Sequence, residues 1–305
     1  MKVAVIGAGA MGSLYGGLLA GGRKNRVVLI SRRAELVEKA KRSGLLIETA
    51  EGPIRAEVEA RLGSGGLGPQ DLVIILVKAM DTAYAASVAS PLVGPQTMVV
   101  SLQNGLGNIE ILRKILGEGP VIGGASTFGA VSAEPGVVSL RGRGHTAIGE
   151  INGRVTERIE RLRDALAEAS LEPRISVNVE GLIWTKLLIN AGINALAGLM
   201  GLENGRLLAF PEAQSLMTRA VLEAEKVAEK LGIRLETESP AELVREVCLK
   251  TKDNACSTLQ DIRAKRPTEI AFINGAVAEL GRSRGLSAPV NEILAALVKI
   301  REETY

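Results

Sequence analysis

Three polar residues, Lys186, Asn190 and Asn194, recur every four positions in a segment that is otherwise apolar. A spacing of four places them on one face of a helix. Burying a lysine and two asparagines costs free energy unless partners or a ligand satisfy them. The stripe therefore predicts a substrate pocket in which one cation donates a proton. A solvated stripe is the alternative, which the glycine and β-branched residues of the segment disfavour.

Two later segments carry further polar side chains. Ser257 and Asp261 share one face of a predicted helix. Glu269 lies two residues after Pro267, near a predicted helix N-terminus. A carboxylate at that place complements the helix dipole, and taken alone Glu269 is explained by this structural role.

Lys78 and Asn104 each follow a predicted strand. Lys78 comes directly after Asp71–Val77, and Asn104 follows Met98–Ser101 within a Gln-Asn-Gly sequence. Ligands of open parallel sheets bind at the carboxyl ends of the strands, so both side chains are candidates for a site there. Both also have an ordinary explanation, since lysines often end strands and Asn-Gly is a common turn dipeptide.

The chain opens with a short apolar strand, Lys2–Ile6, that runs into Gly7-Ala8-Gly9-Ala10-Met11-Gly12. Gly7 permits a tight turn, Gly9 lets the backbone approach a diphosphate, and Gly12 lets the next helix pack closely on the sheet. The diphosphate would lie over the helix N-terminus, where unpaired N–H groups favour anions. The pattern predicts a dinucleotide site, with a purely structural glycine turn as the alternative.

A second strand, Arg26–Ile30, ends in Ser31-Arg32-Arg33. An acid about 20 residues past the glycine turn normally accepts a hydrogen bond from the ribose 2′-hydroxyl of NAD. Here a hydroxyl and two guanidinium groups stand in its place, which suits a 2′-phosphate and favours NADPH over NADH. A solvated pair of arginines at a helix start is the alternative.

The elements that must position these residues divide the chain in two. Its 305 residues, 46% of them apolar, suffice for two domains. Up to about residue 174, short apolar runs alternate with helical segments, which predicts an α/β fold with a parallel sheet. The expected strands are Lys2–Ile6, Arg26–Ile30, Leu45–Thr49, Asp71–Val77, Met98–Ser101 and Val121–Ala125. A hairpin turn is expected at Glu134-Pro135-Gly136, and an amphipathic helix at Arg154–Ala169.

The second half has helical periodicity throughout, interrupted by four prolines. We therefore expect a dinucleotide-binding domain over residues 1–176 and an all-helical domain over residues 177–305. The active site is expected in the cleft between them. The apolar helical domain also suggests a homodimer.

Composition excludes several functions. A net charge of +3 and only seven aromatic residues argue against a nucleic-acid partner. The single histidine, His145, argues against a multi-histidine metal site, so no metal is expected. Cys248 and Cys256 form no disulfide framework, which fits a cytoplasmic location. The first apolar run ends after six residues, and no run approaches the ~20 apolar residues of a membrane span.

Six segments in order resemble the ketopantoate reductase (2-dehydropantoate 2-reductase) family: GAGAMGS, the lysine after DLVIILV, SLQNGLGN, WTKLLINAGINAL, NACSTLQD and TEIAFINGA. The resemblance covers essentially the whole chain. Its start is common to Rossmann enzymes, whereas K-x3-N-x3-N followed by S-x11-E and N-G is fairly specific. It implies a Rossmann-type doubly wound sheet followed by an all-helical, 6-phosphogluconate-dehydrogenase-like domain. It also implies reduction of 2-dehydropantoate to (R)-pantoate with NADPH, in pantothenate and coenzyme A biosynthesis.

The resemblance assigns roles to individual residues. It implies that Lys186 and Glu269 are catalytic. The implied substrate-binding residues are Asn104, Asn190, Asn194, Asn204 and Ser257. The expected cofactor-binding residues are Gly7, Ala8, Gly9, Ala10, Met11, Gly12, Ser31, Arg32, Lys78 and Asn104. Position 32 matches the arginine that faces the 2′-phosphate, although the neighbouring Arg33 makes this alignment ambiguous by one residue.

In the expected mechanism, Lys186 stabilises the developing alkoxide and protonates it. Glu269 either holds Lys186 in place or binds the substrate hydroxyl. Two other functions stay open: a related reductase of another 2-oxo or 3-oxo acid or an imine, and a non-catalytic protein that senses nicotinamide. NADH in place of NADPH, and feedback inhibition by coenzyme A at the cofactor site, also stay open.

Overall fold

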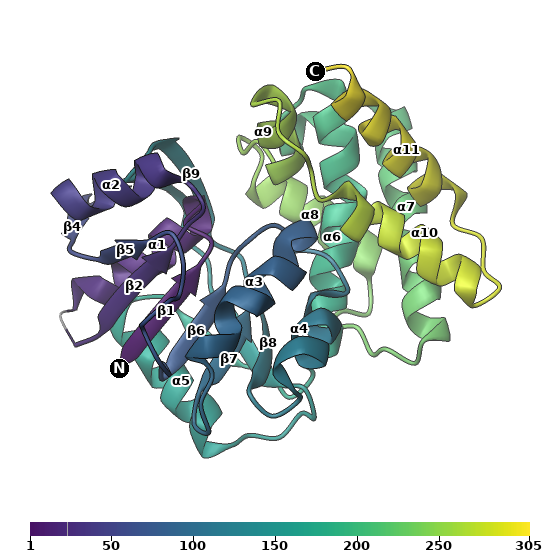
Figure 1. Cartoon of the computed structure of the whole chain (residues 1–305). Coiled ribbons are helices and arrows are strands. Elements are labelled where there is room, and N and C mark those ends of the chain that lie inside the picture. Colours follow the sequence, from purple (N-terminus) through teal and green to yellow (C-terminus); the bar gives the residue numbers. More distant parts are fainter. Residues whose placement is uncertain (23) are drawn as a thin grey trace. The chain divides into compact units, whose positions relative to one another are not determined.

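The computed structural model describes residues 1–22 and 24–305, which form two compact units (Figure 1). The first, here called the sheet unit, comprises Met1–Gln103 and Gly107–Val179. The second, the helical unit, comprises Asn104–Leu106 and Glu180–Tyr305. The short segment 104–106 therefore belongs to the helical unit although its neighbours in sequence belong to the sheet unit.

An eight-stranded sheet forms the centre of the sheet unit, in the order β12-β11-β8-β7-β6-β1-β2-β5. Neighbouring strands are parallel except for β8 and β11. The strands are β1 (Lys2–Ile6), β2 (Arg26–Ile30), β5 (Glu59–Arg61), β6 (Leu72–Ile75), β7 (Met98–Ser101), β8 (Val121–Ser126), β11 (Thr146–Glu150) and β12 (Pro173–Ile175). Since the chain runs from β1 to β2 on one side and returns to β6 on the other, β1 marks the point where strand order reverses.

Helices cover both faces of this sheet, as the predicted doubly wound α/β fold requires. Alternate residues of β1 enter two separate cores: Val3 and Val5 pack with α1, whereas Ala4 and Ile6 pack on the side of α3. The helical elements are α1 (Ala10–Gly21), α2 (Ala34–Ser43), η1 (Ala79–Asp81), α3 (Thr82–Ala89), η2 (Ser90–Leu92), α4 (Asn108–Leu116) and α5 (Glu157–Glu168).

A second, four-stranded sheet in the order β4-β3-β10-β9 belongs to the same unit. Its strands are β3 (Leu45–Thr49), β4 (Gly52–Ala56), β9 (Gly129–Glu134) and β10 (Val137–Gly142). The expectation that Leu45–Thr49 continues the parallel sheet was therefore wrong. Glycines on α1 explain the arrangement, because a Cβ at Gly16 would meet Leu29 of the main sheet at 2.4 Å and one at Gly17 would meet Ile47 of the second sheet at 2.6 Å. Because glycine has no Cβ atom, α1 can pack tightly between the two sheets.

The helical unit consists of helices around one apolar core. Its elements are α6 (Val179–Met200), η3 (Asn204–Ala209), α7 (Pro211–Lys230), α8 (Pro240–Lys250), α9 (Ser257–Arg263), η4 (Ile270–Phe272), α10 (Asn274–Ser283) and α11 (Pro289–Glu303). Pro211, Pro240 and Pro289 each occupy the first helical turn, where a missing N–H costs nothing. Pro267 instead lies between α9 and η4.

Helix α6 corrects one expectation. Its 22 residues are long and apolar enough to cross a membrane by length and composition. However, 61% of its most apolar window is buried, and residues such as Leu187, Leu188 and Ala191 form part of the core of the helical unit. Burial of this extent is typical of a core helix of a globular unit.

Candidate functional site

The glycine turn after β1 is tight on one side and open on the other. Gly7 has φ +102°, and a Cβ there would lie 2.7 Å from the backbone of Leu76 and Val77. A Cβ at Gly12 would lie 1.8 Å from the carbonyl oxygen of Gly7. At Gly9, in contrast, a Cβ would meet nothing within 4 Å. Gly7 and Gly12 are thus required by packing, whereas Gly9 faces space that a ligand can approach.

The N-terminus of α1 fits an anionic ligand. Gly9 is its N-cap residue, no side chain caps it, and its first turn carries no acidic residue. Arg33 braces the turn, because its Nη2 donates a hydrogen bond to the carbonyl oxygen of Ala8 (2.8 Å). A dinucleotide diphosphate is the kind of group that such a turn accommodates.

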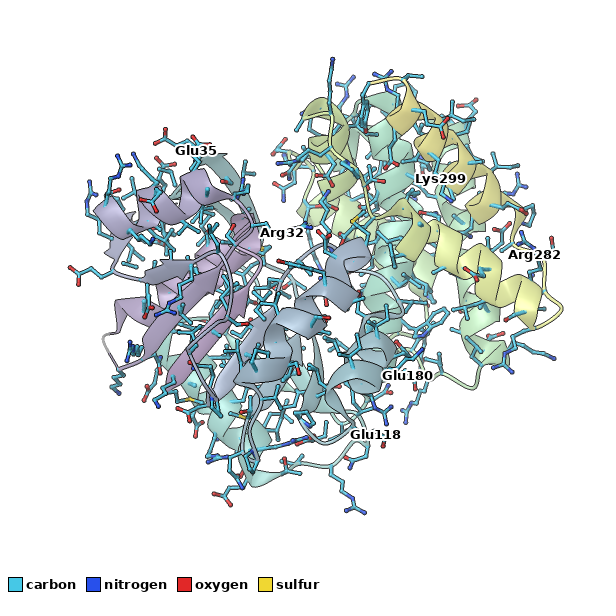
Figure 2. All side chains as sticks on the ribbon, viewed as in Figure 1. Arg32, Glu35, Glu118, Glu180, Arg282 and Lys299 are labelled. Carbon is cyan, nitrogen blue, oxygen red and sulfur yellow. The ribbon has the colours of Figure 1, made fainter. Side chains whose placement is uncertain are left out.

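Arg32 lies at the carboxyl end of β2, with its side chain 59% exposed (Figure 2). Its Nη2 is 2.5 Å from Oδ2 of Asp81, and its Cζ is 5.3 Å from the centre of the Tyr84 ring. Ser31 is buried, and its Oγ accepts a hydrogen bond from the Arg33 amide (3.2 Å). Arg32 therefore presents a cation at the surface, whereas Arg33 is engaged with the glycine turn.

Lys78 is half-buried directly before η1. A polar network fixes the neighbouring strand ends. Gln103 donates from Nε2 to the carbonyl oxygen of Val77 (3.1 Å) and to Oγ1 of Thr82 (2.8 Å), and its Oε1 accepts from Ser101 (3.0 Å). These bonds hold together the segments that follow β6 and β7, and so restrict the backbone that carries Lys78.

The polar stripe lies on α6 as its spacing indicates. Lys186 and Asn190 are half-buried, and Asn194 is buried. Four residues of helix rise about 6 Å, so the stripe extends about 12 Å along the axis. At its far end, Nδ2 of Asn194 lies 3.5 Å from Oγ of Ser257, the first residue of α9. Ser257 is exposed.

Glu269 and Asn104, which are far apart in sequence, are joined by a hydrogen bond within the helical unit. It precedes η4 and is only 8% exposed. Its Oε2 accepts a hydrogen bond from Nδ2 of Asn104 (3.2 Å). The backbone amide of Leu106 donates to the carbonyl oxygen of Phe272 (3.0 Å). A buried carboxylate is therefore held by an amide that lies 165 positions earlier in the chain.

Gly105 explains how this segment approaches η4. Its φ is +81°, and a Cβ there would lie 2.7 Å from both Cβ and the carbonyl oxygen of Phe272. The glycine therefore permits close contact between two backbone segments in addition to a tight turn. This contact is what places the Asn104 amide on Glu269.

Lys186 has a strongly perturbed ammonium. Burial lowers its pKa from 10.5 to about 8, and the negative charge of Glu269 acts in the opposite direction. Both residues belong to the helical unit, and the charge of Glu269 acts on the ammonium of Lys186. A lysine with a pKa near 8 is a strong enough acid to give up a proton near neutral pH, yet it remains largely protonated at pH 7.

Asn204 lies apart from this group in its hydrogen bonding. It opens η3, its Nδ2 donates to Oγ1 of Thr251 (2.9 Å), and its backbone amide donates to the carbonyl oxygen of Asn254 (3.0 Å). Asp261, which shares α9 with Ser257, is buried and pairs with Arg266 (3.3 Å). These contacts tie neighbouring turns of the helical unit together.

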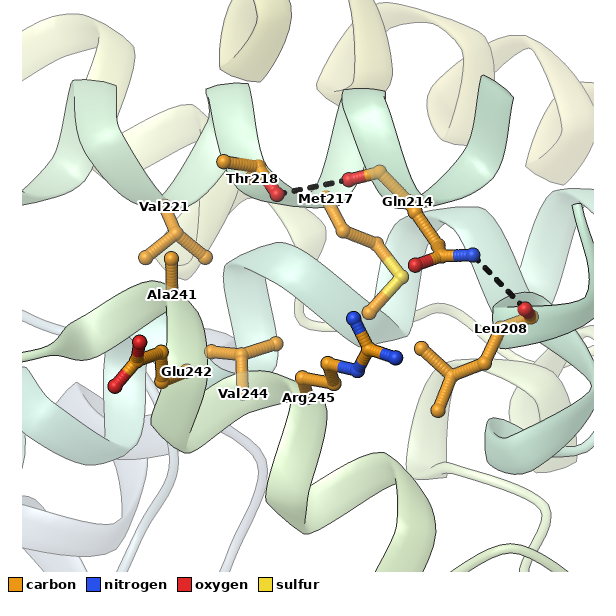
Figure 3. A pocket seen from close by; sticks show the side chains of 9 residues that line it. All are labelled: Leu208, Gln214, Met217, Thr218, Val221, Ala241, Glu242, Val244 and Arg245. Atoms are coloured by element: carbon orange, nitrogen blue, oxygen red, sulfur yellow. Dashed lines mark hydrogen bonds between the residues drawn. The ribbon is translucent and has the colours of Figure 1, made fainter. Parts of the chain in front are cut away.

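A cavity of about 190 Å³ lies between α7 and α8, but none of the candidate residues lines it (Figure 3). Its lining residues are Leu208, Gln214, Met217, Thr218, Val221, Ala241, Glu242, Val244 and Arg245. Within residues 1–22 and 24–305, no group of three or more His, Cys, Asp or Glu side chains could hold a metal ion.

The sequence predicted that Arg32 and Arg33 both suit a 2′-phosphate, whereas the structure shows Arg33 bound to the carbonyl oxygen of Ala8. The two residues that contact Arg32, Asp81 and Tyr84, were not predicted from the sequence. Asp81 follows Lys78 by three positions, so a search for acids after every strand end, rather than after β2 alone, would have included it.

Two family models match the chain, one in each half. The family model for ketopantoate reductase PanE/ApbA matches residues 3–153, and the model for its C-terminal domain matches residues 178–302. The chain is 38% identical over 302 residues to 2-dehydropantoate 2-reductase of Pyrococcus horikoshii, covering 99% of this chain and 98% of that protein. It is 35% identical over 306 residues to the Halobacterium salinarum enzyme of the same name, covering 99% of each.

Solved structures show the same fold over the whole chain. A PanE/ApbA family ketopantoate reductase from Ralstonia eutropha superposes with a TM-score of 0.92 at 32% identity, covering 100% of this chain and 99% of that one. D-mandelate dehydrogenase with NADH and anilino(oxo)acetate superposes with a TM-score of 0.94 at 29% identity, with the same coverage. With both family models matched and relatives above 30% identity along its full length, the chain belongs to the ketopantoate reductase family.

Proposed function

We propose that the protein reduces the ketone of 2-dehydropantoate to the alcohol of (R)-pantoate, using a nicotinamide dinucleotide. The observation that carries this proposal is that Lys186 shares one face of α6 with two asparagines and that burial lowers the pKa of its ammonium to about 8. The full-length relatives named 2-dehydropantoate 2-reductase support the choice of substrate.

A reduced nicotinamide, when bound, supplies the hydride for C2 of the ketone. Lys186 then has two tasks at the ketone oxygen. Its Nζ donates a hydrogen bond that stabilises the negative charge developing on that oxygen, and it transfers its proton there. Glu269 opposes the effect of burial and so keeps Lys186 protonated before the reaction.

The remaining polar groups of the helical unit provide recognition. Asn190, Asn194 and Ser257 offer amide and hydroxyl groups for the carboxylate and hydroxyl of the substrate, and Asn104 is oriented by its bond to Glu269. A substrate that lacks one of these oxygens would leave a polar group unpaired, which lowers its affinity.

The sheet unit carries the residues that would hold the cofactor. The Gly7–Gly12 turn and the N-terminus of α1 fit a diphosphate. Lys78 follows β6 and Ser31 follows β2, the two strands on either side of β1. The guanidinium of Arg32 can bind a 2′-phosphate, which favours NADPH. The proposal also includes NADH as a second cofactor.

Reduction of a different 2-oxo acid is the second candidate function. Its support is the similarity to D-mandelate dehydrogenase, whose structure contains NADH and anilino(oxo)acetate. Lys186 serves either substrate, since every 2-oxo acid presents the same ketone oxygen. A comparison of kcat/KM for 2-dehydropantoate and for aryl and alkyl 2-oxo acids distinguishes the two functions.

The test follows oxidation of NADPH and NADH by absorbance with 2-dehydropantoate. We expect Lys186→Ala to lower kcat by about two orders of magnitude or more, in line with the loss of a general acid, while NADPH still binds. Lys226→Ala, which removes an exposed lysine of α7, serves as the matched control. Near-normal kcat in Lys186→Ala would refute the role of this lysine, and tight NADPH binding without turnover of any keto acid would indicate a sensor.

A further inference from the structure

Asp81 forms an ion pair with Arg32, the arginine expected to bind the 2′-phosphate of the cofactor. Its Oδ2 lies 2.5 Å from Nη2 of Arg32, and the same guanidinium lies over the ring of Tyr84 at 5.3 Å. The Asp81 side chain is 27% exposed, so a ligand that reaches Arg32 also meets this carboxylate.

The register of the main sheet shows where the pair lies. Ile6, at the end of β1, pairs with Ile30 of β2 on one side and with Ile75 of β6 on the other. Arg32 follows β2 and Asp81 follows β6, so the ion pair joins segments from both sides of β1. The glycine turn leaves the same end of β1, and ligands of open sheets bind at this switch point.

The pair contributes little to the stability of the fold. Solvent weakens an ion pair when one partner is largely exposed. Arg32 is 59% exposed and Asp81 is 27% exposed. The pair therefore leaves the guanidinium available for another anion, at the cost of separating it from Asp81.

The choice of cofactor follows from this competition. A 2′-phosphate must take the guanidinium from Asp81 and then lies near a second negative charge, which opposes its binding. A ribose 2′-hydroxyl has no charge to repel and can donate a hydrogen bond to the carboxylate. We propose that Asp81 is a specificity-determining residue that lowers the preference for NADPH and allows NADH to be used. This inference rests on the proposed function.

The test measures cofactor affinity directly, without keto acid. NADPH and NADH are titrated by nicotinamide fluorescence into the wild type, Asp81→Asn, Arg32→Ala and the double variant. We expect Asp81→Asn to raise the affinity for NADPH relative to NADH by about tenfold, because the carboxylate no longer competes or repels. In the Arg32→Ala background the same change should alter that ratio by about twofold or less, since the competition needs the guanidinium.

Glu51→Gln is the matched control, because Glu51 forms a similar exposed ion pair with Arg143 (3.1 Å) in the same unit and its loss changes the net charge equally. We expect no change in the NADPH/NADH ratio there. Asp81→Ser provides a second variant, which should give the same order of affinities as Asp81→Asn. An unchanged ratio in both Asp81 variants, or a shift toward NADH, overturns the inference.

The two proposals fail separately in this design. A wild type that binds both nicotinamides but does not reduce 2-dehydropantoate refutes the proposed substrate, and the affinity ratios still decide the role of Asp81. A wild type that binds neither nicotinamide overturns both.

Discussion

The activity should fall as the pH rises through the pKa of Lys186. A general acid works in its protonated form, so activity is present below the pKa and is lost above it. With a pKa of about 8, about nine-tenths of the lysine is protonated at pH 7 and about one-tenth at pH 9. We therefore expect kcat/KM to fall about tenfold between these two values. A lysine with the ordinary pKa of 10.5 would give an almost flat profile over the same range.

Glu269→Gln tests the electrostatic part of this reasoning. Glutamine keeps the size of the side chain and still offers an oxygen to Asn104, but it removes the charge that raises the pKa of Lys186. Without this charge, burial alone acts on the pKa of Lys186 and lowers it further. The decline in kcat/KM should therefore begin at a lower pH in this variant than in the wild type, and activity at pH 7 should fall with it.

The assay is the initial rate of NADPH oxidation at limiting 2-dehydropantoate, measured from pH 6 to pH 10. Glu203→Gln is the control, because it removes a carboxylate of the same unit that pairs with Arg263 and not with Lys186. Its profile should match the wild type. A wild-type profile that stays flat to pH 10, or a decline at the same pH in Glu269→Gln, would refute the reasoning.

Two further substitutions test the framework of the helical unit. Gly105→Ala should destabilise the protein to urea by more than Gly201→Ala and lower kcat/KM. Both glycines have positive φ, and alanine in this conformation destabilises the fold by about 1–2 kcal/mol. Only the Cβ at position 105 would also meet backbone atoms, those of Phe272 at 2.7 Å. Equal effects of the two substitutions would contradict this close contact. Glu223→Gln should lower the free energy of unfolding in urea by about 2 kcal/mol, with little change in kcat/KM. The reason is that Glu223 accepts hydrogen bonds from the amides of Val290 and Asn291 (3.0 Å each) at the start of α11. Unchanged stability would contradict this role.

The main features of the fold were accessible from the sequence because they depend on local patterns. Runs such as Lys2–Ile6 and Arg26–Ile30 are apolar along both faces, which is typical of strands covered on both sides. The pairing of β3 with β10 depends instead on residues about 90 positions apart. The three-residue edge strands β5 and β12 are too short to show any periodicity.

In the candidate site too, local patterns could be predicted from the sequence, whereas contacts between distant residues could not. The four-residue spacing predicted that Lys186, Asn190 and Asn194 share one face of α6. The sequence could not show that the Asn104 amide reaches Glu269, nor that Arg32 pairs with an acid that follows a different strand. Both contacts arise from tertiary structure, and both involve turn segments whose residues have ordinary local explanations.

Burial and charge act on Lys186 in opposite directions, and the proposed chemistry needs both. Burial alone would continue to lower the pKa until the lysine lost its proton before the ketone was reduced. The charge of Glu269 alone would raise the pKa and make the ammonium a weaker acid toward the alkoxide. Glu269 is itself buried and is held by Asn104, whose position depends on the close approach of Gly105 to Phe272. A glycine 81 positions before Lys186 therefore helps to determine how strong an acid this lysine is.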